Sequence, residues 1–391
     1  MIIGIDATPL DRPSTRRRGI GVYSRRLIEA LSLKNENLGH PHRFLLTRLN
    51  GTTVTERDQV IVLPAIRKPS RFQWLLDRWT VPRFLKRCRV DVFHATDFFS
   101  VPESETTKVL AHVHDMIPFV FWNQYSSQFP FDMRWLLRRA RQRVHYAQRI
   151  ITDSLHSKQD IAELTGYPEQ RIHVVYFGPA VASLLSKSDG DQAGEDVPLP
   201  PYFGHQQGES YPYFLYVGGT DFRKNLPFLI RAFSAFSEKH SEVRLLLVGE
   251  TFFMRKLAEV DEIYKEIERL GLHNRVQMTG YVNEKLLRLL YRRSRALLFP
   301  SFYEGFGLPV LEAMAAGTPV LAARASSVPE ILGDTGLYFD PHKEDSLIAA
   351  MEQIYANDRL RSDCIERARR RAQLFSWEKA AEQIFKIYGE L

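Results

Sequence analysis

Cysteine is scarce in this chain of 391 residues, which contains only Cys88 and Cys364. The two lie far apart in the sequence and give no sign of a disulfide framework. This excludes the small secreted folds that depend on several disulfide bonds. We expect a protein that works in a reducing compartment.

Long apolar runs are also missing. The runs Phe214–Val217 and Leu245–Val248 are far shorter than the roughly 20 residues of a membrane-spanning helix. The first residues, MIIGIDATPL, lack the basic region and the long apolar region of a signal peptide. The sequence therefore predicts a cytoplasmic protein that does not span a bilayer.

Acidic residues are too few to balance the basic ones, and the formal net charge is +7. The excess lies mainly in the N-terminal half, within residues 12–26 and 67–89, which predicts an anionic partner on that side. Nucleic acid is disfavoured because the sequence has no zinc-finger spacing, RNP motif or recognisable helix-turn-helix. Phosphate-bearing lipid or sugar carriers fit better.

Short apolar segments alternate with longer amphipathic ones throughout the chain. This alternation predicts an α/β fold with parallel sheets covered by helices. The expected helices run from about Gly21 to Leu31 and from about Leu226 to Lys239. The expected strands are Ile2–Ile5, Phe44–Leu46, Val60–Leu63, Val92–Ala95, Val109–Val113, Arg149–Thr152, Tyr213–Val217, Arg244–Val248, Val276–Thr279, Ala296–Phe299 and Val320–Ala322.

The length exceeds what one hydrophobic core usually serves, so we expect two domains. Residues 187–212 are dense in Gly, Asp, Pro and Gln and have no hydrophobic period, as in an exposed connection. We therefore expect an N-terminal Rossmann-like domain over 1–190, a linker over 191–212 and a C-terminal one over 213–375. The amphipathic stretch 376–391 is expected to pack back across the domain junction and complete the first domain.

The segment Phe299–Gly317, FPSFYEGFGLPVLEAMAAG, joins a buried strand, a glycine loop and a helix entered through a proline. Gly305 and Gly307, with Phe306 and Leu308, leave backbone N–H groups uncovered where the helix dipole is positive. This predicts an anion site for a pyrophosphate.

Two glutamates bracket this loop. Glu312 could accept hydrogen bonds from both hydroxyls of a ribose, while Glu304 would face the sugar. A lone glutamate there would more often be a solvated surface residue, so the prediction depends on the whole segment.

A second polar loop, GGTDFRKN, follows the expected strand Tyr213–Val217. Ligands of parallel sheets bind at the carboxyl ends of strands. Arg223 and Lys224, beyond Gly219, could therefore neutralise a leaving diphosphate as a divalent metal does elsewhere. The alternative is a surface cation pair.

In the first half, Gly19 and Gly21 open the first expected helix but lack the third glycine of a dinucleotide fingerprint. They fit a flexible loop that admits substrate, although ordinary turn chemistry explains them as well. His112, His114 and Asp115 follow the strand Val109–Val113. A zinc site would need more ligands nearby, so we expect no metal and a hydrogen-bonding role for His114.

The arginine-rich stretch Arg134–Arg149 has an amphipathic helical pattern. It could lie on an anionic membrane near a polyprenyl-linked acceptor, at the inner face of the plasma membrane. An ordinary surface helix is the alternative. The apolar residues of this pattern are Trp135, Leu136, Leu137, Val144 and Tyr146.

Together these residues resemble the family-4 glycosyltransferases over nearly the whole chain. In that family two glutamates separated by seven residues frame the glycine loop, as Glu304 and Glu312 do, and an Arg-Lys pair matches Arg223 and Lys224. The more weakly matched positions are the N-terminal glycine loop (Gly19, Gly21), the sugar-contacting histidine (His114), the base-contacting turn (Tyr281, Val282) and the SxPE stretch (Pro329, Glu330).

The resemblance implies the GT-B architecture, in which two Rossmann-like domains face a central cleft. It also implies a metal-independent, retaining transfer of a hexose from a nucleotide sugar, with no cofactor, to a saccharide or polyprenyl-linked saccharide during bacterial surface polysaccharide synthesis. GDP-mannose is the favoured donor and UDP-glucose or a related sugar the alternative. A sugar-nucleotide epimerase of the same architecture and a non-catalytic assembly subunit are the rival readings.

Overall fold

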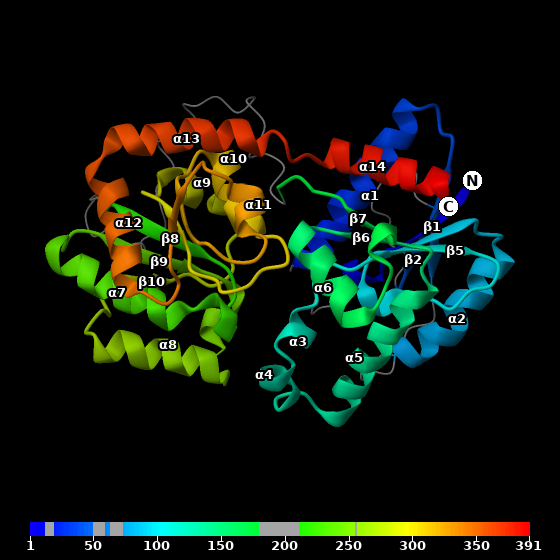
Figure 1. Ribbon diagram of the computed structural model, residues 1–391, viewed down its shortest axis with the longest axis horizontal. Coiled ribbons are helices and arrows are strands. Elements are labelled where there is room, and N and C mark those ends of the chain that lie inside the picture. The colour runs from blue at the N-terminus through cyan, green and yellow to red at the C-terminus, as the bar shows by residue number, and fades with distance from the viewer. Residues whose placement is uncertain (12–18, 50–58, 63–72, 180–210, 255) are drawn as a thin grey trace. The chain divides into compact units, whose positions relative to one another are not determined.

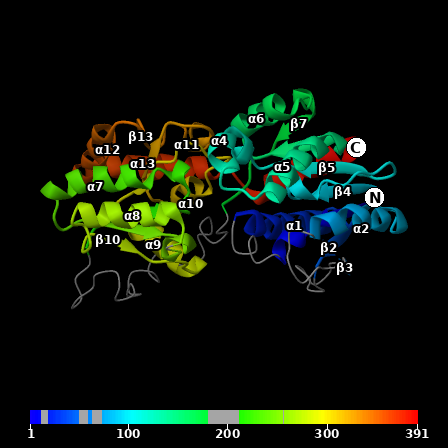
Figure 2. The ribbon, with the colours of Figure 1, turned by 90° about the horizontal axis from the view of Figure 1, so that it is seen from below.

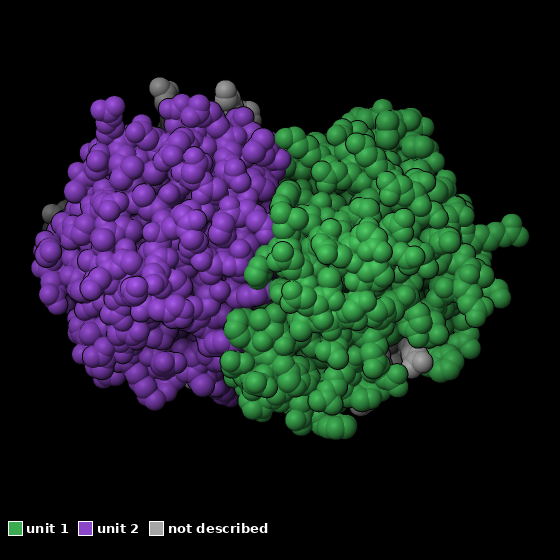
Figure 3. All heavy atoms as spheres, in the orientation of Figure 1, with its two compact units in different colours: residues 1–180, 376–391 green, residues 181–375 purple. Residues whose placement is uncertain are grey.

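The computed structural model describes residues 1–11, 19–49, 59–62, 73–179, 211–254 and 256–391. The chain forms two compact units, which Figure 3 colours separately. Unit 1 comprises residues 1–180 and 376–391, and unit 2 comprises residues 181–375.

Unit 1 is built on a seven-stranded sheet in the order β3-β2-β1-β4-β5-β6-β7, in which every neighbouring pair is parallel. Its strands are β1 (Ile2–Asp6), β2 (Arg43–Arg48), β3 (Gln59–Val62), β4 (Val92–Ala95), β5 (Lys108–His112), β6 (Arg149–Thr152) and β7 (Ile172–Val174). Its helices are α1 (Gly19–Asn37), α2 (Gln73–Arg87), α3 (Ile117–Val120), α4 (Trp122–Ser126), α5 (Phe131–Arg143), α6 (Leu155–Thr165) and α14 (Trp377–Glu390).

The C-terminal helix α14 belongs to unit 1 although unit 2 precedes it in the chain. It packs against α1, and both Figure 1 and Figure 2 place it, in red, among the elements of unit 1. Ile384 and Tyr388 on its apolar face are fully buried. The Tyr388 hydroxyl lies 2.7 Å from Nδ1 of His94, so a polar contact also ties the helix to β4.

Unit 2 has a six-stranded parallel sheet in the order β10-β9-β8-β11-β12-β13. Its strands are β8 (Tyr213–Val217), β9 (Arg244–Val248), β10 (Val276–Met278), β11 (Leu297–Phe299), β12 (Val320–Ala323) and β13 (Leu337–Phe339). Its helices are α7 (Leu226–Lys239), α8 (Ala258–Arg269), α9 (Glu284–Arg293), α10 (Leu308–Ala316), α11 (Val328–Leu332), α12 (Glu344–Ala356) and α13 (Asp358–Ala372).

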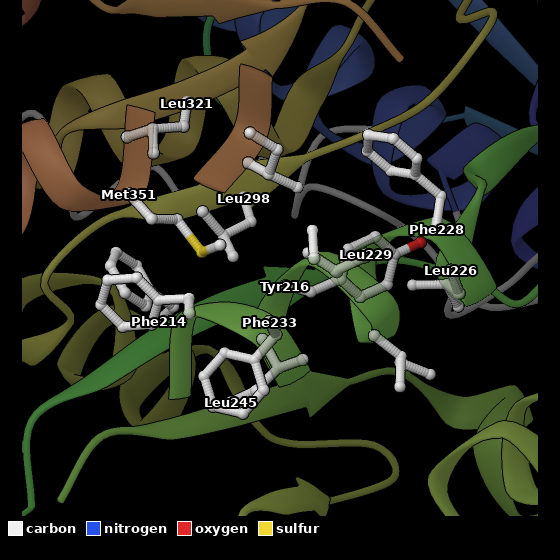
Figure 4. Close-up of a cluster of buried hydrophobic side chains, with 14 of the residues drawn as sticks. Phe214, Tyr216, Leu226, Phe228, Leu229, Phe233, Leu245, Leu298, Leu321 and Met351 are labelled. Atoms are coloured by element: carbon white, nitrogen blue, oxygen red, sulfur yellow. The ribbon is translucent and has the colours of Figure 1, made fainter. Parts of the chain in front are cut away.

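The core of unit 2 lies where helices cover the sheet. Side chains from four strands pack with side chains of α7 and α12, as Figure 4 shows. Central strands such as β12 are buried on both faces, which explains why their sequences are continuously apolar. The labelled members of this cluster include Phe214, Leu245, Leu298, Leu321, Phe233 and Met351.

The strand order of unit 2 reverses direction at its centre. From β8 the sheet grows to β9 and β10 on one side, and to β11, β12 and β13 on the other. The loops after β8 and β11 therefore diverge at a topological switch point, where parallel sheets bind ligands. Both motifs of the C-terminal half, residues 218–225 and 300–307, occupy these two loops.

The predicted helix Arg134–Arg149 is wrong at its C-terminal end. α5 stops at Arg143, a 3-10 turn follows, and Arg149 begins β6. The chain turns there because Val144 is fully buried in the core of unit 1. No helix formed by the described residues is both long and apolar enough to cross a membrane.

Candidate active site

A compact charge cluster forms between the two central loops of unit 2. Lys224 donates from Nζ to Oε1 of Glu304 at 2.5 Å, and Arg223 donates from Nη1 to Oε2 of the same carboxylate at 2.9 Å. Nε of Arg223 lies 3.2 Å from Oδ1 of Asp221. Lys224 and Glu304 are 9% and 7% exposed, so the expected alternative of a surface cation pair is wrong.

Burial and charge act in opposite directions on this cluster. Burial alone would raise the pKa of Glu304, but the Lys224 and Arg223 charges outweigh it and lower the pKa to about 2. Burial lowers the pKa of Lys224, and the Glu304 carboxylate opposes that shift. Glu304 therefore stays ionised at neutral pH and holds both cations in one orientation.

The backbone around Glu304 is fixed by two serines that precede α11. The Glu304 N–H donates to Oγ of Ser326 at 2.8 Å, and Oγ of Ser327 donates to the Glu304 and Phe306 carbonyls. Ser327 is the serine of the SxPE stretch, and the sequence had not suggested this role. The carbonyl of Arg223 accepts from the N–H of Phe302 at 2.8 Å, which ties the two loops together.

Gly305, Phe306, Gly307 and Leu308 lie at the entrance of α10, as the motif predicts. Gly307 is the N-cap residue and has φ of +106°, a conformation that only glycine adopts without strain. It offers no capping side chain, and Pro309 in the first turn has no N–H. No side chain of the N-cap residue therefore caps this helix start, where the helix dipole is positive.

Glu312 lies one turn into α10 and is 6% exposed. Its Oε2 accepts a hydrogen bond from the Tyr291 hydroxyl of α9 at 2.9 Å. Burial raises the pKa of Glu312 to about 7, although the Tyr291 hydrogen bond pulls it downward. The two buried glutamates of the motif thus lie in opposite electrostatic environments.

The remaining predicted residues of unit 2 lie beyond the ends of β8 and β10, on either side of β9 in the sheet. The carbonyl of Gly219 accepts from the Tyr216 hydroxyl at 2.7 Å, which fixes the loop after β8. Tyr281 and Val282 follow β10, and the Tyr281 side chain is 57% exposed. The Gly280 carbonyl just before them accepts from the N–H of Gly249, so this turn is tied to the end of β9.

Gly19, Gly21 and His114 belong to unit 1. The two glycines lie in the first turn of α1, so they are part of a helix and not of a loop; residues 12–18, before them, lie outside the described residues. The ring of Tyr23, two residues after Gly21, lies 4.6 Å from the rings of both His112 and His114. The start of α1 and the end of β5 are therefore brought together.

The histidines share a carboxylate that the sequence analysis missed. Asp153, directly after β6, has Oδ1 2.5 Å from Nε2 of His112 and Oδ2 2.9 Å from Nδ1 of His114. Together these three are the group that could hold a metal ion among the residues the structure describes. Their facing atoms already hydrogen-bond to one another, so we interpret the group as a polar network.

Comparison with known proteins agrees with this geometry. A family model described as "Glycosyl transferases group 1" matches residues 203–371, and one described as "Glycosyltransferase Family 4" matches residues 17–179. Two Rossmann-like units with parallel sheets define the GT-B class of glycosyltransferases. These two matches, together with the mannosyltransferase relatives, support a family-4 glycosyltransferase of the GT-B class.

Relatives extend over the full chain. It is 28% identical to the O-antigen chain mannosyltransferase B of Escherichia coli over 413 residues, which cover 97% of each protein. The fold is similar to that of sucrose-phosphate synthase from Thermosynechococcus elongatus (TM-score 0.76, 20% identity, 100% and 98% covered). It is also similar to Anabaena HepE in complex with UDP-glucose (TM-score 0.72, 18% identity, 100% of each chain covered).

Proposed function

We propose that this glycosyltransferase transfers mannose from GDP-mannose, with retention of anomeric configuration and without a metal, to a saccharide or polyprenyl-linked saccharide of a bacterial surface polysaccharide. The observation that carries the proposal is the buried Arg223, Lys224 and Glu304 cluster beside the α10 start. The Escherichia coli relative, named an O-antigen chain mannosyltransferase, supports the sugar and the pathway class.

The proposed donor site joins three features of unit 2. The diphosphate lies on the N–H groups at the start of α10, close to the cations of Arg223 and Lys224. The ribose hydroxyls donate to Glu312, and the base rests against the turn at Tyr281 and Val282. In this arrangement the Glu312 carboxylate binds the ribose, and the Glu304 carboxylate orients the cations of Arg223 and Lys224.

In the proposed reaction, an acceptor hydroxyl oxygen attacks the anomeric carbon from the face that the diphosphate leaves. The carbon–oxygen bond to the β-phosphate breaks as the new glycosidic bond forms, and the acceptor proton passes to the departing phosphate. The products are a glycoside and a nucleoside diphosphate. Such a reaction requires positioning and stabilisation of negative charge more than a strong base. Arg223 and Lys224 supply that charge, which supports a metal-independent step.

A panel of nucleotide sugars tests the proposal. The full-length protein should hydrolyse GDP-mannose slowly and transfer mannose faster when a saccharide acceptor is added, and EDTA should leave both rates unchanged. Faster turnover of UDP-glucose than of GDP-mannose would make UDP-glucose the donor. UDP-glucose is kept as the alternative because the fold is similar to that of Anabaena HepE, whose structure contains UDP-glucose. Epimerisation without an acceptor, or binding without turnover, would overturn the proposal.

The Lys224→Ala variant links the activity to the cluster. We expect its turnover to fall about 100-fold or more, because one charge-stabilising group in such a site is worth about that much. Lys239→Ala removes an exposed lysine at the end of α7 and is the matched control. A Lys224→Ala protein as active as the control would disconnect this cluster from catalysis.

We also propose that α5 rests on an anionic membrane. Phe131 and Trp135, one turn apart, are exposed, and Arg138 and Arg139 follow one turn further on. Sedimentation with anionic vesicles at low salt should remove the protein from solution, and Phe131→Ser with Trp135→Ser should reduce that binding. Equal recovery of parent and variant in the supernatant at low salt would contradict the proposal.

A further inference from the structure

Three polar side chains of unit 1 meet at the carboxyl ends of two neighbouring strands. His112 is the last residue of β5, His114 follows two positions later, and Asp153 follows β6. The strands are parallel neighbours, and the N–H of Val113 donates to the carbonyl of Ile151 at 3.0 Å beyond the last strand pair. All three groups therefore lie at the sheet edge where ligands of this fold class bind.

The hydrogen bonds assign the protons of this network. An ionised carboxylate only accepts, so Nε2 of His112 and Nδ1 of His114 must both carry protons that point to Asp153. Nδ1 of a neutral His112 then carries no proton, and it accepts a hydrogen bond from the Tyr23 hydroxyl, 2.6 Å away. Tyr23, His112, Asp153 and His114 thus form one directed chain of donors and acceptors.

One ring nitrogen of this hydrogen-bonded network has no partner among the described residues. Nε2 of His114 is buried and makes no hydrogen bond within the part of the chain that the structure describes. A buried ring nitrogen left unpaired costs free energy, and such costs are commonly met at sites where a substrate supplies the missing partner. An oxygen of the substrate fits this position, since a hydroxyl both donates and accepts.

The ring of His114 is restrained on further sides. It stacks on His112 with ring centroids 4.0 Å apart and meets the edge of Tyr23. Tyr23 is in turn packed against Phe177 and against Trp377 of α14. The network is therefore embedded in the packing of α1 and α14 and cannot turn without moving them.

We propose that Asp153, supported by His112 and Tyr23, is a positioning residue that fixes the ring of His114 with Nε2 directed at an oxygen of the substrate. The proposal rests on the proposed function, since it takes His114 as a substrate contact. Asp153 touches no reacting atom and acts only through His114.

The charges agree with this arrangement. Burial lowers the pKa of His112 to about 4, and repulsion from His114 adds to the shift, so His112 is neutral at pH 7. Burial also opposes a charged His114, but Asp153 outweighs it and raises the pKa of His114. The carboxylates of Asp97 and Asp115 act on His114 in the same direction as Asp153.

A double-mutant cycle tests the proposal with the rate of nucleoside diphosphate release from GDP-mannose. We expect His114→Ala to lose about 100-fold and Asp153→Asn about 10-fold to 100-fold, as orienting carboxylates do in comparable sites. The double variant should be no slower than His114→Ala, because Asp153 then has nothing to position. Glu163→Gln, an exposed carboxylate of α6, is the matched control.

The outcomes separate the inference from the proposed function. The inference alone would be overturned if the two losses of rate multiplied in the double variant. It would also be overturned if Asp153→Asn were as fast as the parent while His114→Ala was slow. A His114→Ala protein as fast as the parent would remove His114 from the site and the inference with it. Absence of any turnover by the parent would refute the proposed function.

A second readout does not depend on activity. Histidine side-chain ¹⁵N shifts report which ring nitrogen carries the proton, and His114→Ala identifies the signal. At a pH where the ring of His114 is neutral, we expect the proton on Nδ1 in the parent and a mixture of the two tautomers in Asp153→Asn. An unchanged Nδ1 proton in the variant would mean that Asp153 does not set the ring, even in a correctly folded protein.

Discussion

The two glutamates of the C-terminal motif show how neighbours decide the state of identical side chains. Both are nearly fully buried. Two cations outweigh the burial of Glu304, so its pKa falls to about 2, whereas Glu312 has only the Tyr291 hydroxyl and its pKa rises to about 7. One carboxylate is permanently charged, and the other titrates near neutral pH.

Glu312 should therefore make unit 2 less stable as the pH rises. Between pH 4.5 and 7 the folded protein retains a proton that the unfolded chain has released, so the free energy of unfolding falls through this window. Glu312→Gln, which is always neutral and can still accept from Tyr291, should be more stable than the parent at pH 8. The gain is on the order of 3 kcal/mol at most, since each unit of pKa shift corresponds to about 1.4 kcal/mol.

Thermal unfolding at pH 8 and pH 5 measures this effect. The gain of Glu312→Gln should be largest at pH 8 and should shrink at pH 5, while Glu268→Gln, an exposed glutamate of α8, should show no such dependence. A Glu312→Gln protein with the same stability difference from the parent at both pH values would show that Glu312 is not held protonated by its surroundings.

The sequence indicated which residues form the charge cluster of unit 2, but not how they contact one another. Arg223, Lys224 and Glu304 could be identified because each follows an apolar strand in a polar loop. Their pairing could not, since about 80 positions separate the cations from the carboxylate and no local pattern encodes that distance. Asp153 also follows a strand, but an aspartate before a helix usually indicates only a turn, and its histidine partners come from another strand.

At the scale of elements, burial on both faces made the strands easy to place. Val92–Ala95 and Arg149–Thr152 have the bounds that the sequence predicted, because each strand contains a pair of adjacent, buried apolar residues. The end of α5 was predicted wrongly because its arginines continue a helical pattern past Arg143. The pattern cannot show that Val144 turns into the core, since that depends on tertiary packing.

The start of α10 depends on the conformation of one residue. Gly307 has φ of +106°, and its Cβ position is open, so conformation and not space selects glycine there. Gly307→Ala should lower the free energy of unfolding of unit 2 by about 1–2 kcal/mol, because an L-residue is strained in this region. Thermal or urea unfolding measures the change.

Gly389→Ala provides the opposite case. Gly389 lies in α14 with open space around its Cβ position, and its φ is not positive. Alanine there should stabilise the helix by up to about 1 kcal/mol. Equal effects of the two substitutions, or a stabilising Gly307→Ala, would show that the α10 start does not require glycine.

At the scale of the whole molecule, unit 1 is assembled from two separate parts of the chain. The contact between the Tyr388 hydroxyl and Nδ1 of His94 joins these parts in a fully buried setting. Tyr388→Phe should lower the free energy of unfolding of unit 1 by about 1–3 kcal/mol, because it leaves a buried ring nitrogen without its partner. Calorimetry should show that the unfolding transition of unit 1 moves to a lower temperature while that of unit 2 is unchanged.

Tyr146→Phe is the matched control, since that hydroxyl belongs to a 39% exposed side chain of the same unit. We expect it to unfold like the parent. A Tyr388→Phe protein that also unfolds like the parent would mean that apolar packing alone holds α14 in place.

The late position of α14 in the chain sets an order for synthesis. Residues 181–375 leave the ribosome before 376–391, so unit 2 can fold while unit 1 still lacks the helix that covers Ile3, Ile5 and their neighbours. The apolar surface of the N-terminal part therefore stays uncovered until residues 376–391 have been synthesised. Chaperones that bind exposed apolar segments can reach this part of the protein while unit 2 is being made.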